Sequence, residues 1–232
     1  RSRLTAGKVG VIFGHGRSGS NALLQIIRAI NQNLRTLSEP FNKLLSTKRE
    51  AKIRDFLARI EVESCAYQDF LSYLESNYDL YKHSFTQIGV LQNQLMISGK
   101  NIRIVFLTRK NLLRSLVSHH LASKNEIWRP PLGEDLLSLR EKIRSYCYDP
   151  IDIDRLGVNL IEHYHQIKSY KDFLRQNNTE FYELYYEDLF GTDVSFEKKL
   201  TIIDQICNFL KIEKDLDRRG KKVIERLLDA DL

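Results

Sequence analysis

The feature that most constrains this chain is a glycine-rich loop between an apolar run and a helical pattern. Residues Lys8 to Phe13 form a short apolar run that predicts a buried strand, and Asn21 to Ile27 shows helical spacing. The loop between them, Gly14 to Ser20, reads Gly-His-Gly-Arg-Ser-Gly-Ser. A glycine-rich turn that opens a helix presents unpaired backbone N–H groups at the positive end of the helix dipole, where an anion is favoured. The segment therefore predicts a phosphate-binding loop.

Three side chains of the loop support an anion site. Arg17 supplies a positive charge, and the hydroxyls of Ser18 and Ser20 can donate hydrogen bonds to phosphate oxygens. The alternative is an ordinary flexible turn. The preceding strand and the following helix disfavour that alternative, because together they form the strand, loop and helix unit that binds phosphates.

The same glycines also satisfy the dinucleotide-binding pattern, because Gly14, Gly16 and Gly19 have the required spacing. A hydride-transfer enzyme needs in addition a clear second strand that ends in an acid for the ribose. Residues 31–38, which precede Glu39, are mostly polar and predict no such strand. A dinucleotide-dependent enzyme is therefore disfavoured.

The loop departs from the kinase-type P-loop as well. That motif needs Lys and then Ser or Thr after its second glycine, to reach the terminal phosphates and to hold magnesium. Here Gly19 is followed by Ser20 and Asn21. A magnesium-dependent nucleotide kinase is disfavoured, although the general architecture of a phosphate cradle is retained.

Further strands and helices alternate along the rest of the chain. Apolar or β-branched runs predict strands at 79–83, 102–107 and 181–186, and helical spacing marks 112–121, about 159–176, and 196–210. Such alternation predicts an α/β fold, a P-loop-like three-layer αβα sandwich whose central parallel sheet binds ligands at the carboxyl ends of its strands. The glycine loop follows one of these ends.

Length and composition predict a single domain over 1–232. The chain has 232 residues, 42% hydrophobic and 28% charged, which suits one substantial core.

Residues 124–158, with Pro130-Pro131 and Asp149-Pro150, are poorly periodic and predict a lid or an acceptor-binding insertion. No segment approaches eighteen consecutive apolar residues, so we expect no membrane span.

Charge and cysteine content limit which classes of ligand and which cellular compartment we expect. The net charge of +6 favours anionic ligands, without choosing among nucleotides, acidic glycans and nucleic acid. Three cysteines, Cys65, Cys147 and Cys207, are odd in number and lack metal-ligand spacing. We therefore expect neither a disulfide framework nor a metal site, and a reducing, cytoplasmic location.

A second basic turn follows the predicted strand 102–107. It begins Thr108-Arg109-Lys110, and Asn111, Arg114 and Ser118 then follow i, i+3, i+7 spacing, which places them on one polar helix face. This face suits a second phosphate, and a solvated helix start is the alternative. Two phosphate-binding turns at neighbouring strand ends fit a nucleotide with phosphates on both its 5′ and 3′ positions better than they fit ATP or NAD.

At this point the chain resembles the PAPS-dependent sulfotransferases, in particular the bacterial type. The resemblance implies that 3′-phosphoadenylyl sulfate (PAPS) is the donor, that adenosine 3′,5′-bisphosphate is the product, and that no metal takes part. It implies that Arg17-Ser18-Gly19-Ser20, with the adjoining Asn21, holds the 5′-phosphosulfate, and that Arg109 and Ser118 hold the 3′-phosphate. Arg109 and Ser118 are one residue further apart than in the commoner family form, and Lys110-Asn111 stands where Asn-Pro is usual.

Two later segments extend the resemblance. Tyr185-Tyr186-Glu187-Asp188-Leu189 is similar to a family segment whose tyrosine lies near the adenine, which implies that role for Tyr186, although simple packing is the alternative. Arg218-Arg219-Gly220 resembles a basic element that some members place over the 3′-phosphate. For that element the alternative is a solvated charged surface.

The resemblance also suggests residues for catalysis. Lys82, near the end of the strand 79–83, resembles the family lysine that stabilises charge on the bridging oxygen. Glu39, in a Glu-Pro segment, resembles the general base of bacterial-type members, whereas His83 resembles the base of cytosolic ones. Adjacent strand residues point to opposite faces, so His83 and Lys82 could not readily face one substrate, and Glu39 is favoured. For Glu39 the alternative is a turn or helix-capping carboxylate, and for His83 it is a packed or surface histidine.

The sequence leaves the acceptor and two other function classes open. We expect a small-molecule or glycan acceptor with an alcohol, phenol or sugar hydroxyl, or else an amine, and we expect no nucleic acid as a partner. One alternative function is a nucleotide kinase-like phosphotransferase. The other is a non-catalytic nucleotide- or polyanion-binding domain.

Overall fold

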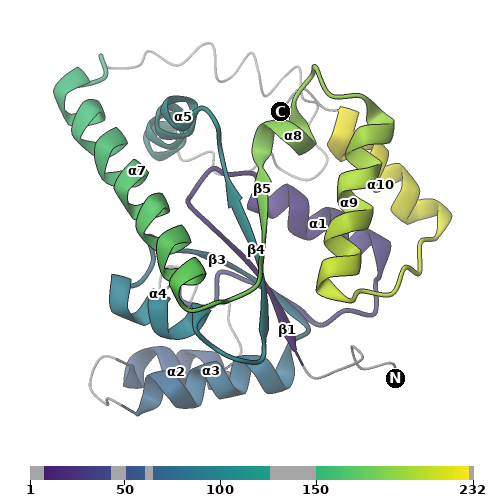
Figure 1. Ribbon diagram of the computed structural model, residues 1–232, viewed down its shortest axis with the longest axis horizontal. Coiled ribbons are helices and arrows are strands. Elements are labelled where there is room, and N and C mark those ends of the chain that lie inside the picture. Colours follow the sequence, from purple (N-terminus) through teal and green to yellow (C-terminus); the bar gives the residue numbers. More distant parts are fainter. Residues whose placement is uncertain (1–7, 43–50, 61–64, 126–149, 230–232) are drawn as a thin grey trace. The chain divides into compact units, whose positions relative to one another are not determined.

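The computed structural model describes residues 8–42, 51–60, 65–125 and 150–229. The chain forms two compact units, one made of Arg1–Lys110 with Tyr170–Leu232 and one of Asn111–Ser169. The first contains the sheet and most of the helices drawn in Figure 1.

A five-stranded sheet forms the centre of the first unit. Its order is β2-β3-β1-β4-β5, and all the neighbouring strands are parallel. The α/β fold with a central parallel sheet is therefore confirmed. The strands are β1 (Val9–Gly14), β2 (Thr36–Ser38), β3 (Leu80–Ser84), β4 (Ile102–Thr108) and β5 (Phe181–Tyr185).

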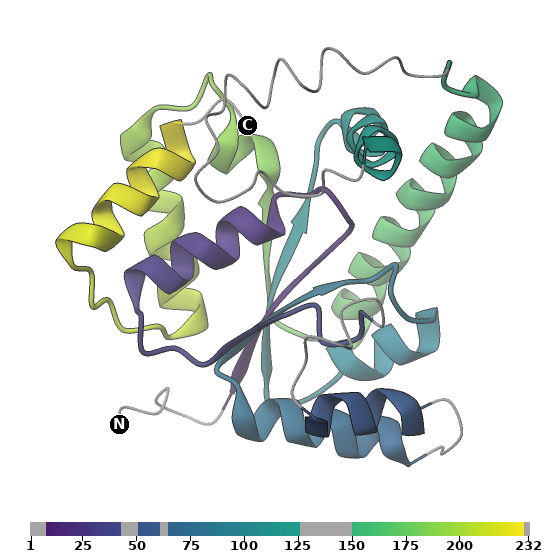
Figure 2. The same cartoon turned by 180° about the vertical axis from the view of Figure 1, so that it is seen from behind.

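Helices cover both faces of this sheet, as Figures 1 and 2 show. On one face lie α1 (Ser20–Ile30), α8 (Tyr186–Phe190), α9 (Phe196–Leu210) and α10 (Arg218–Asp229). The other face is covered by α3 (Ala66–Asn77), α4 (Val90–Ile97) and the last turns of α7 (Ile153–Gln176), with α2 (Ala51–Arg59) packed on α3.

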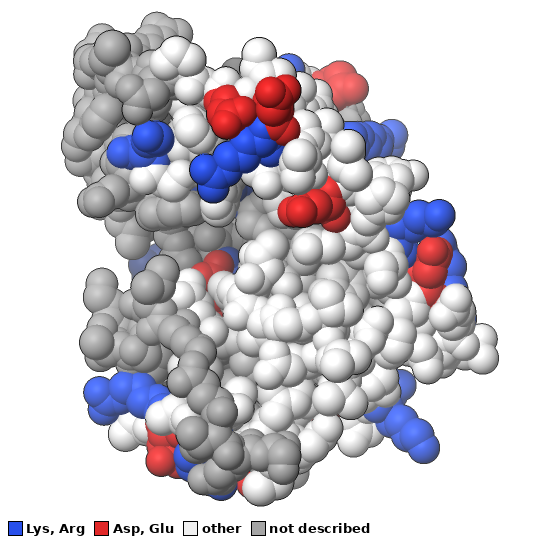
Figure 3. All heavy atoms as spheres, turned by 90° about the vertical axis from the view of Figure 1, so that its left-hand side faces the viewer, with Lys and Arg blue, Asp and Glu red and all other residues white. Residues whose placement is uncertain are grey.

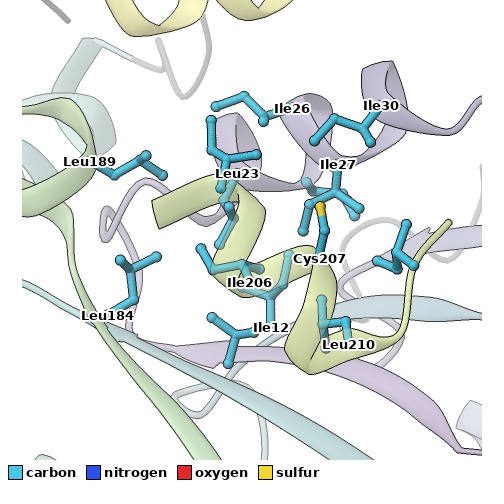
Figure 4. Packing of buried hydrophobic residues seen from close by; sticks show 14 of the residues in the cluster. Ile12, Leu23, Ile26, Ile27, Ile30, Leu184, Leu189, Ile206, Cys207 and Leu210 are labelled. Atoms are coloured by element: carbon cyan, nitrogen blue, oxygen red, sulfur yellow. The ribbon is translucent and has the colours of Figure 1, made fainter. Parts of the chain in front are cut away.

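The two faces have different cores because strand side chains alternate between them. The face toward α1 and α9 is aliphatic, and Figure 4 shows Ile12 of β1 meeting side chains of those helices. The other face is aromatic, with the Phe13 ring in contact with the rings of Phe106 and Tyr170. Burying each large apolar side chain contributes about 1.5–3 kcal/mol, so both layers stabilise the sheet.

The structure corrects one inference about residues 31–38. The polar composition of this stretch predicts no strand, yet Thr36–Ser38 forms β2, which ends just before Glu39. The strand is only three residues long, which explains why its pattern is weak. It pairs with β3 rather than β1, whereas in the classical dinucleotide-binding order the second strand lies beside the first. The topology therefore still disfavours a dinucleotide site.

The second unit holds α5 (Leu112–Asn125) and α7 up to Ser169. Most of the predicted lid, residues 126–149, lies outside the described residues. At its edges the poorly periodic sequence forms helix, because Lys124 and Asn125 end α5 and Ile153 begins α7. Among the helices of the described ranges, none combines the length and the apolar character needed to cross a bilayer.

Candidate functional site

The predicted site residues of the first unit lie at the carboxyl edge of the sheet. Because all the strands are parallel, the segments that follow them meet at this one edge. The glycine loop follows β1, Glu39 follows β2, and Lys82 lies near the end of β3. Arg109 and Tyr186 follow β4 and β5 directly. The fold thus gathers residues that are far apart in the sequence.

The glycine loop has the backbone of an anion cradle. Arg17 has a φ of 62° and Gly19 a φ of 86°, both in the left-handed region. Alternation of left- and right-handed residues turns successive N–H groups inward and creates a concavity for anions. Helix α1 begins at Ser20, directly after this loop, so its first N–H groups and its dipole also favour an anion there.

Two positions of the loop require glycine because atoms of neighbouring segments lie too close for a side chain. A Cβ at Gly14 would lie 2.3 Å from the carbonyl oxygen of Leu107, and a Cβ at Gly19 would lie 2.6 Å from the ring of Tyr186. The loop is therefore seated against the end of β4 and against the first residue of α8. Its shape depends on these contacts as well as on its own glycines.

Ser18 lies inside the loop. The residue is fully buried, and its hydroxyl has no hydrogen-bond partner among the described residues. Leaving a buried hydroxyl unpaired costs about 1–3 kcal/mol. The resemblance implies a contact between Ser18 and a phosphate, and in this conformation such a contact requires the loop to open. Ser20, by contrast, is only partly buried at the first turn of α1.

Arg17, Arg109 and Tyr186 form a cationic cluster beside the loop. The guanidinium of Arg109 lies over the Tyr186 ring, 3.8 Å from its centroid. Burial, followed by the nearby charge of Arg109, lowers the pKa of Arg17, while Tyr186 acts in the opposite direction. Two guanidinium groups that repel each other are stabilised when anionic groups bind beside them. This cluster is therefore suited to a phosphate or a sulfate.

Lys110 anchors the turn that carries Arg109. Its backbone N–H donates to the Glu187 carboxylate at 2.8 Å, and its ammonium pairs with Asp188. Both acids lie in the first turn of α8, where the helix dipole favours negative charge. The β4 turn and the start of α8 are thus tied together, which places Arg109 against Tyr186.

Lys82 and Glu39 form an ion pair on the α1 face of the sheet. The Lys82 ammonium bonds one oxygen of the Glu39 carboxylate and also donates to the side-chain oxygen of Asn21 at 2.8 Å. Only 3% of the Lys82 side chain is exposed, compared with 18% of the Glu39 side chain. Glu39 is therefore the more accessible partner. Asn21, implied to contact the nucleotide, here orients the lysine.

His83 points to the opposite face of β3. It is 1% exposed, and its Nε2 lies 2.8 Å from the side-chain oxygen of Asn93. The rings of Phe13 and Phe41 pack against it. Burial lowers the pKa of His83 to about 4, so it is neutral near pH 7. These surroundings favour the packed role over that of a base that must reach an acceptor.

The second predicted phosphate turn continues into the second unit, which holds Ser118. There the Asn111 side chain accepts a hydrogen bond from the N–H of Arg114 at 3.0 Å, just before α5 begins. Asn111 is thus an N-terminal cap of α5. The role of Ser118 at a 3′-phosphate stays a prediction.

The basic element Arg218-Arg219-Gly220 begins a helix that packs on α1. It forms the first turn of α10, and a Cβ at Gly220 would lie 2.3 Å from the carbonyl oxygen of Ala29. Ala29 is in the last turn of α1, about 14 Å along that helix from the glycine loop. The role of this element over the 3′-phosphate stays a prediction.

Charge on the face shown in Figure 3 is mixed rather than concentrated. On the face shown in Figure 3, Lys and Arg groups lie next to Asp and Glu groups, with a wide uncharged area between them. Over the coloured residues of that face, the net charge of +6 forms no continuous basic field. Among the residues that the structure describes, no cluster of His, Cys, Asp and Glu suits a metal ion.

Comparison with known proteins adds no assignment. No protein-family model matches the chain, and no curated protein matches it either. The geometry at the carboxyl edge of the sheet is therefore the basis for inferring a function.

Proposed function

We propose that the protein is a sulfotransferase that moves the sulfuryl group of PAPS to a hydroxyl acceptor. One observation carries the proposal. A left-handed phosphate-type loop, the stacked pair Arg109 and Tyr186, and the Lys82–Glu39 ion pair lie at the same edge of one parallel sheet. This combination offers both an anion site and an acid–base pair.

The donor set fits a nucleotide with two separate anionic groups. The loop and Arg17 would hold the 5′-phosphosulfate, and Arg109 would hold the 3′-phosphate. Tyr186, whose ring face supports Arg109, would also contact the base of the nucleotide. Sulfuryl transfer to a hydroxyl can proceed by charge stabilisation from cationic side chains such as these.

The chemistry assigns a separate role to each member of the ion pair. As the acceptor oxygen forms a bond to sulfur, the bond between sulfur and the bridging phosphate oxygen breaks in line. Glu39 takes the proton of the acceptor hydroxyl. Lys82 and Arg17 stabilise the negative charge on the bridging oxygen, and adenosine 3′,5′-bisphosphate leaves.

We also propose a cytoplasmic location and a small-molecule or glycan acceptor. Cys65 and Cys207, the cysteines within the described ranges, are both free thiols, which fits a reducing compartment. The partial exposure of Glu39 fits an acceptor that approaches from solvent.

Calorimetric titration with adenosine 3′,5′-bisphosphate tests the donor site. We expect wild type to bind it more tightly than magnesium-ATP or NAD(P), and Arg109→Ala to weaken binding about tenfold to a hundredfold. Arg28→Ala is the matched control, because Arg28 is an exposed arginine in the last turn of α1. Preference for magnesium-ATP would favour the phosphotransferase alternative and reject the proposal.

Transfer itself is tested with sulfur-labelled PAPS and a panel of phenols, alcohols, sugars and amines. We expect label in a hydroxyl acceptor with wild type, and loss of transfer with retained bisphosphate binding in Glu39→Gln. Binding of the bisphosphate without transfer to any member of the panel would instead support a non-catalytic nucleotide-binding domain.

A further inference from the structure

The turn that carries Glu39 is strained and tightly held. Strand β2 ends at Ser38, and the N–H of Glu39 still donates to the carbonyl of Lys82 at 2.6 Å. Glu39 then adopts a φ of 56°, a left-handed conformation that is uncommon for a residue other than glycine. Such strain persists only where the surrounding structure imposes it, and it often accompanies function.

Two neighbouring features impose this conformation. The N–H of Asn42 donates to the carbonyl of Glu39 at 3.0 Å, which closes a β-turn with Pro40 at its second position, where proline is favoured. Phe41, only 2% exposed, anchors the turn between the rings of Phe70 and His83. The turn therefore returns Asn42 to the side of Glu39.

The side chain of Asn42 completes the contact. Its Nδ2 donates to Oε2 of Glu39 at 2.9 Å, while the Lys82 ammonium bonds Oε1. The carboxylate is thus held through both oxygens by donors from different segments. Each carboxylate oxygen has two lone pairs, so a proton acceptor site can remain on an oxygen that already accepts one bond. A donor to the charged form also favours ionisation.

We propose that Asn42 is a positioning residue for the Glu39 base: its side-chain amide fixes the carboxylate orientation and favours the ionised form. Describing Glu39 as a base rests on the proposed function. The effect on the carboxylate follows from the contact itself. Together with the Lys82 ammonium, Asn42 therefore shifts the acid limb of the pH dependence of transfer to lower pH, because a protonated Glu39 cannot accept the hydroxyl proton.

The test follows the Glu39 carboxyl carbon by NMR during a pH titration, with the signal assigned by its loss in Glu39→Gln. In Asn42→Ala we expect the titration midpoint to rise by roughly one pH unit relative to wild type, and at least as much in Asn42→Asp. Asn77→Ala, which removes an exposed amide that bonds the Tyr73 carbonyl, is the matched control and should leave the midpoint unchanged. Equal midpoints in wild type and both Asn42 variants would overturn the inference.

Folding and function are separated by two further measurements. Asn42→Asp is nearly isosteric with the native residue, so it carries the test if Asn42→Ala fails to fold. Bisphosphate affinity should stay unchanged in a folded Asn42 variant, because the substitution lies outside the glycine loop. If wild type binds no bisphosphate although the midpoint shifts, the sulfotransferase proposal fails while the effect of Asn42 on the carboxylate stands.

Discussion

Tyr186 contacts two parts of the candidate site at once. Its ring lies under the Arg109 guanidinium and against Gly19, where an added Cβ would be 2.6 Å away. A cation over an aromatic face contributes about 0.5–1 kcal/mol at exposed sites and about 2 kcal/mol when desolvated. The ring, rather than the hydroxyl, is therefore the part that positions Arg109.

This predicts a difference between two substitutions of Tyr186. Tyr186→Phe keeps the ring face and should retain bisphosphate affinity within about threefold, whereas Tyr186→Leu should lower it about threefold to thirtyfold. Calorimetry on both variants makes the comparison, with circular dichroism to check folding. Equal losses in both variants would show instead that the hydroxyl, and not the ring face, is important.

At this scale the sequence predicts residue types better than it predicts contacts. The loop position of Arg17 and the strand-end position of Arg109 follow from local patterns, because glycines and apolar runs mark those places. The hydrogen bond that Lys82 donates to Asn21 and the burial of Ser18 do not follow from local patterns, because they depend on segments that meet only in the fold. The contact of Asn42 with the Glu39 carboxylate cannot be predicted from the sequence for the same reason, although its place three residues after Glu39 in a Pro-containing turn is a weak signal.

Among the elements, α10 packs unusually close to α1. Gly220 allows this approach, since a Cβ there would lie 2.3 Å from the backbone oxygen of Ala29. Asp217 caps the helix by accepting from the Gly220 N–H at 2.6 Å, and the buried ammonium of Lys199 donates to the Leu228 carbonyl near its other end. Helix α10 is thus fixed at both ends.

Gly220→Ala should therefore destabilise the protein by about 1–3 kcal/mol, because backbone atoms cannot move aside and α10 must shift. Helix propensity alone would give the opposite sign, a gain of up to about 1 kcal/mol. Gly157→Ala in α7 is the matched control, since a Cβ there meets no described atom within 4 Å. Urea denaturation of both variants measures the change in the free energy of unfolding. A higher free energy of unfolding in Gly220→Ala would contradict the close packing of α10 on α1.

Long apolar elements were predicted with their type and approximate bounds, as β4 and α9 show. Strand β2 was not, because three partly buried residues carry no detectable alternation and depend on pairing with β3. The start of α7 was expected about six residues late, since its first turns expose apolar residues such as Ile153 and Val158 and lack a clear stripe.

For the whole molecule, His83 links stability to pH. Its pKa is lowered to about 4 by burial, from the 6.5 expected in the unfolded chain. Between these values the unfolded state binds more protons than the folded state does. The contribution of neutral His83 to the free energy of unfolding is therefore fully present above about pH 6.5 and is lost as the pH falls toward 4. Near pH 5 the loss amounts to about 2 kcal/mol.

Urea denaturation near pH 7 and near pH 5 measures this loss. We expect wild type to lose about 2 kcal/mol more than His83→Gln over this interval. His165→Gln, a change at an exposed histidine, should behave as wild type. An equal pH dependence of wild type and His83→Gln would show that other groups cause the loss.

The shortness of β2 has a consequence for how copies of the chain meet. It forms one edge of the described sheet, and an edge strand exposes a row of backbone groups that can pair with a strand of another molecule. Three residues offer very few such groups, and the turn at Glu39 bends the chain away directly afterwards. The short strand β2 and the turn at Glu39 therefore also disfavour edge-to-edge aggregation.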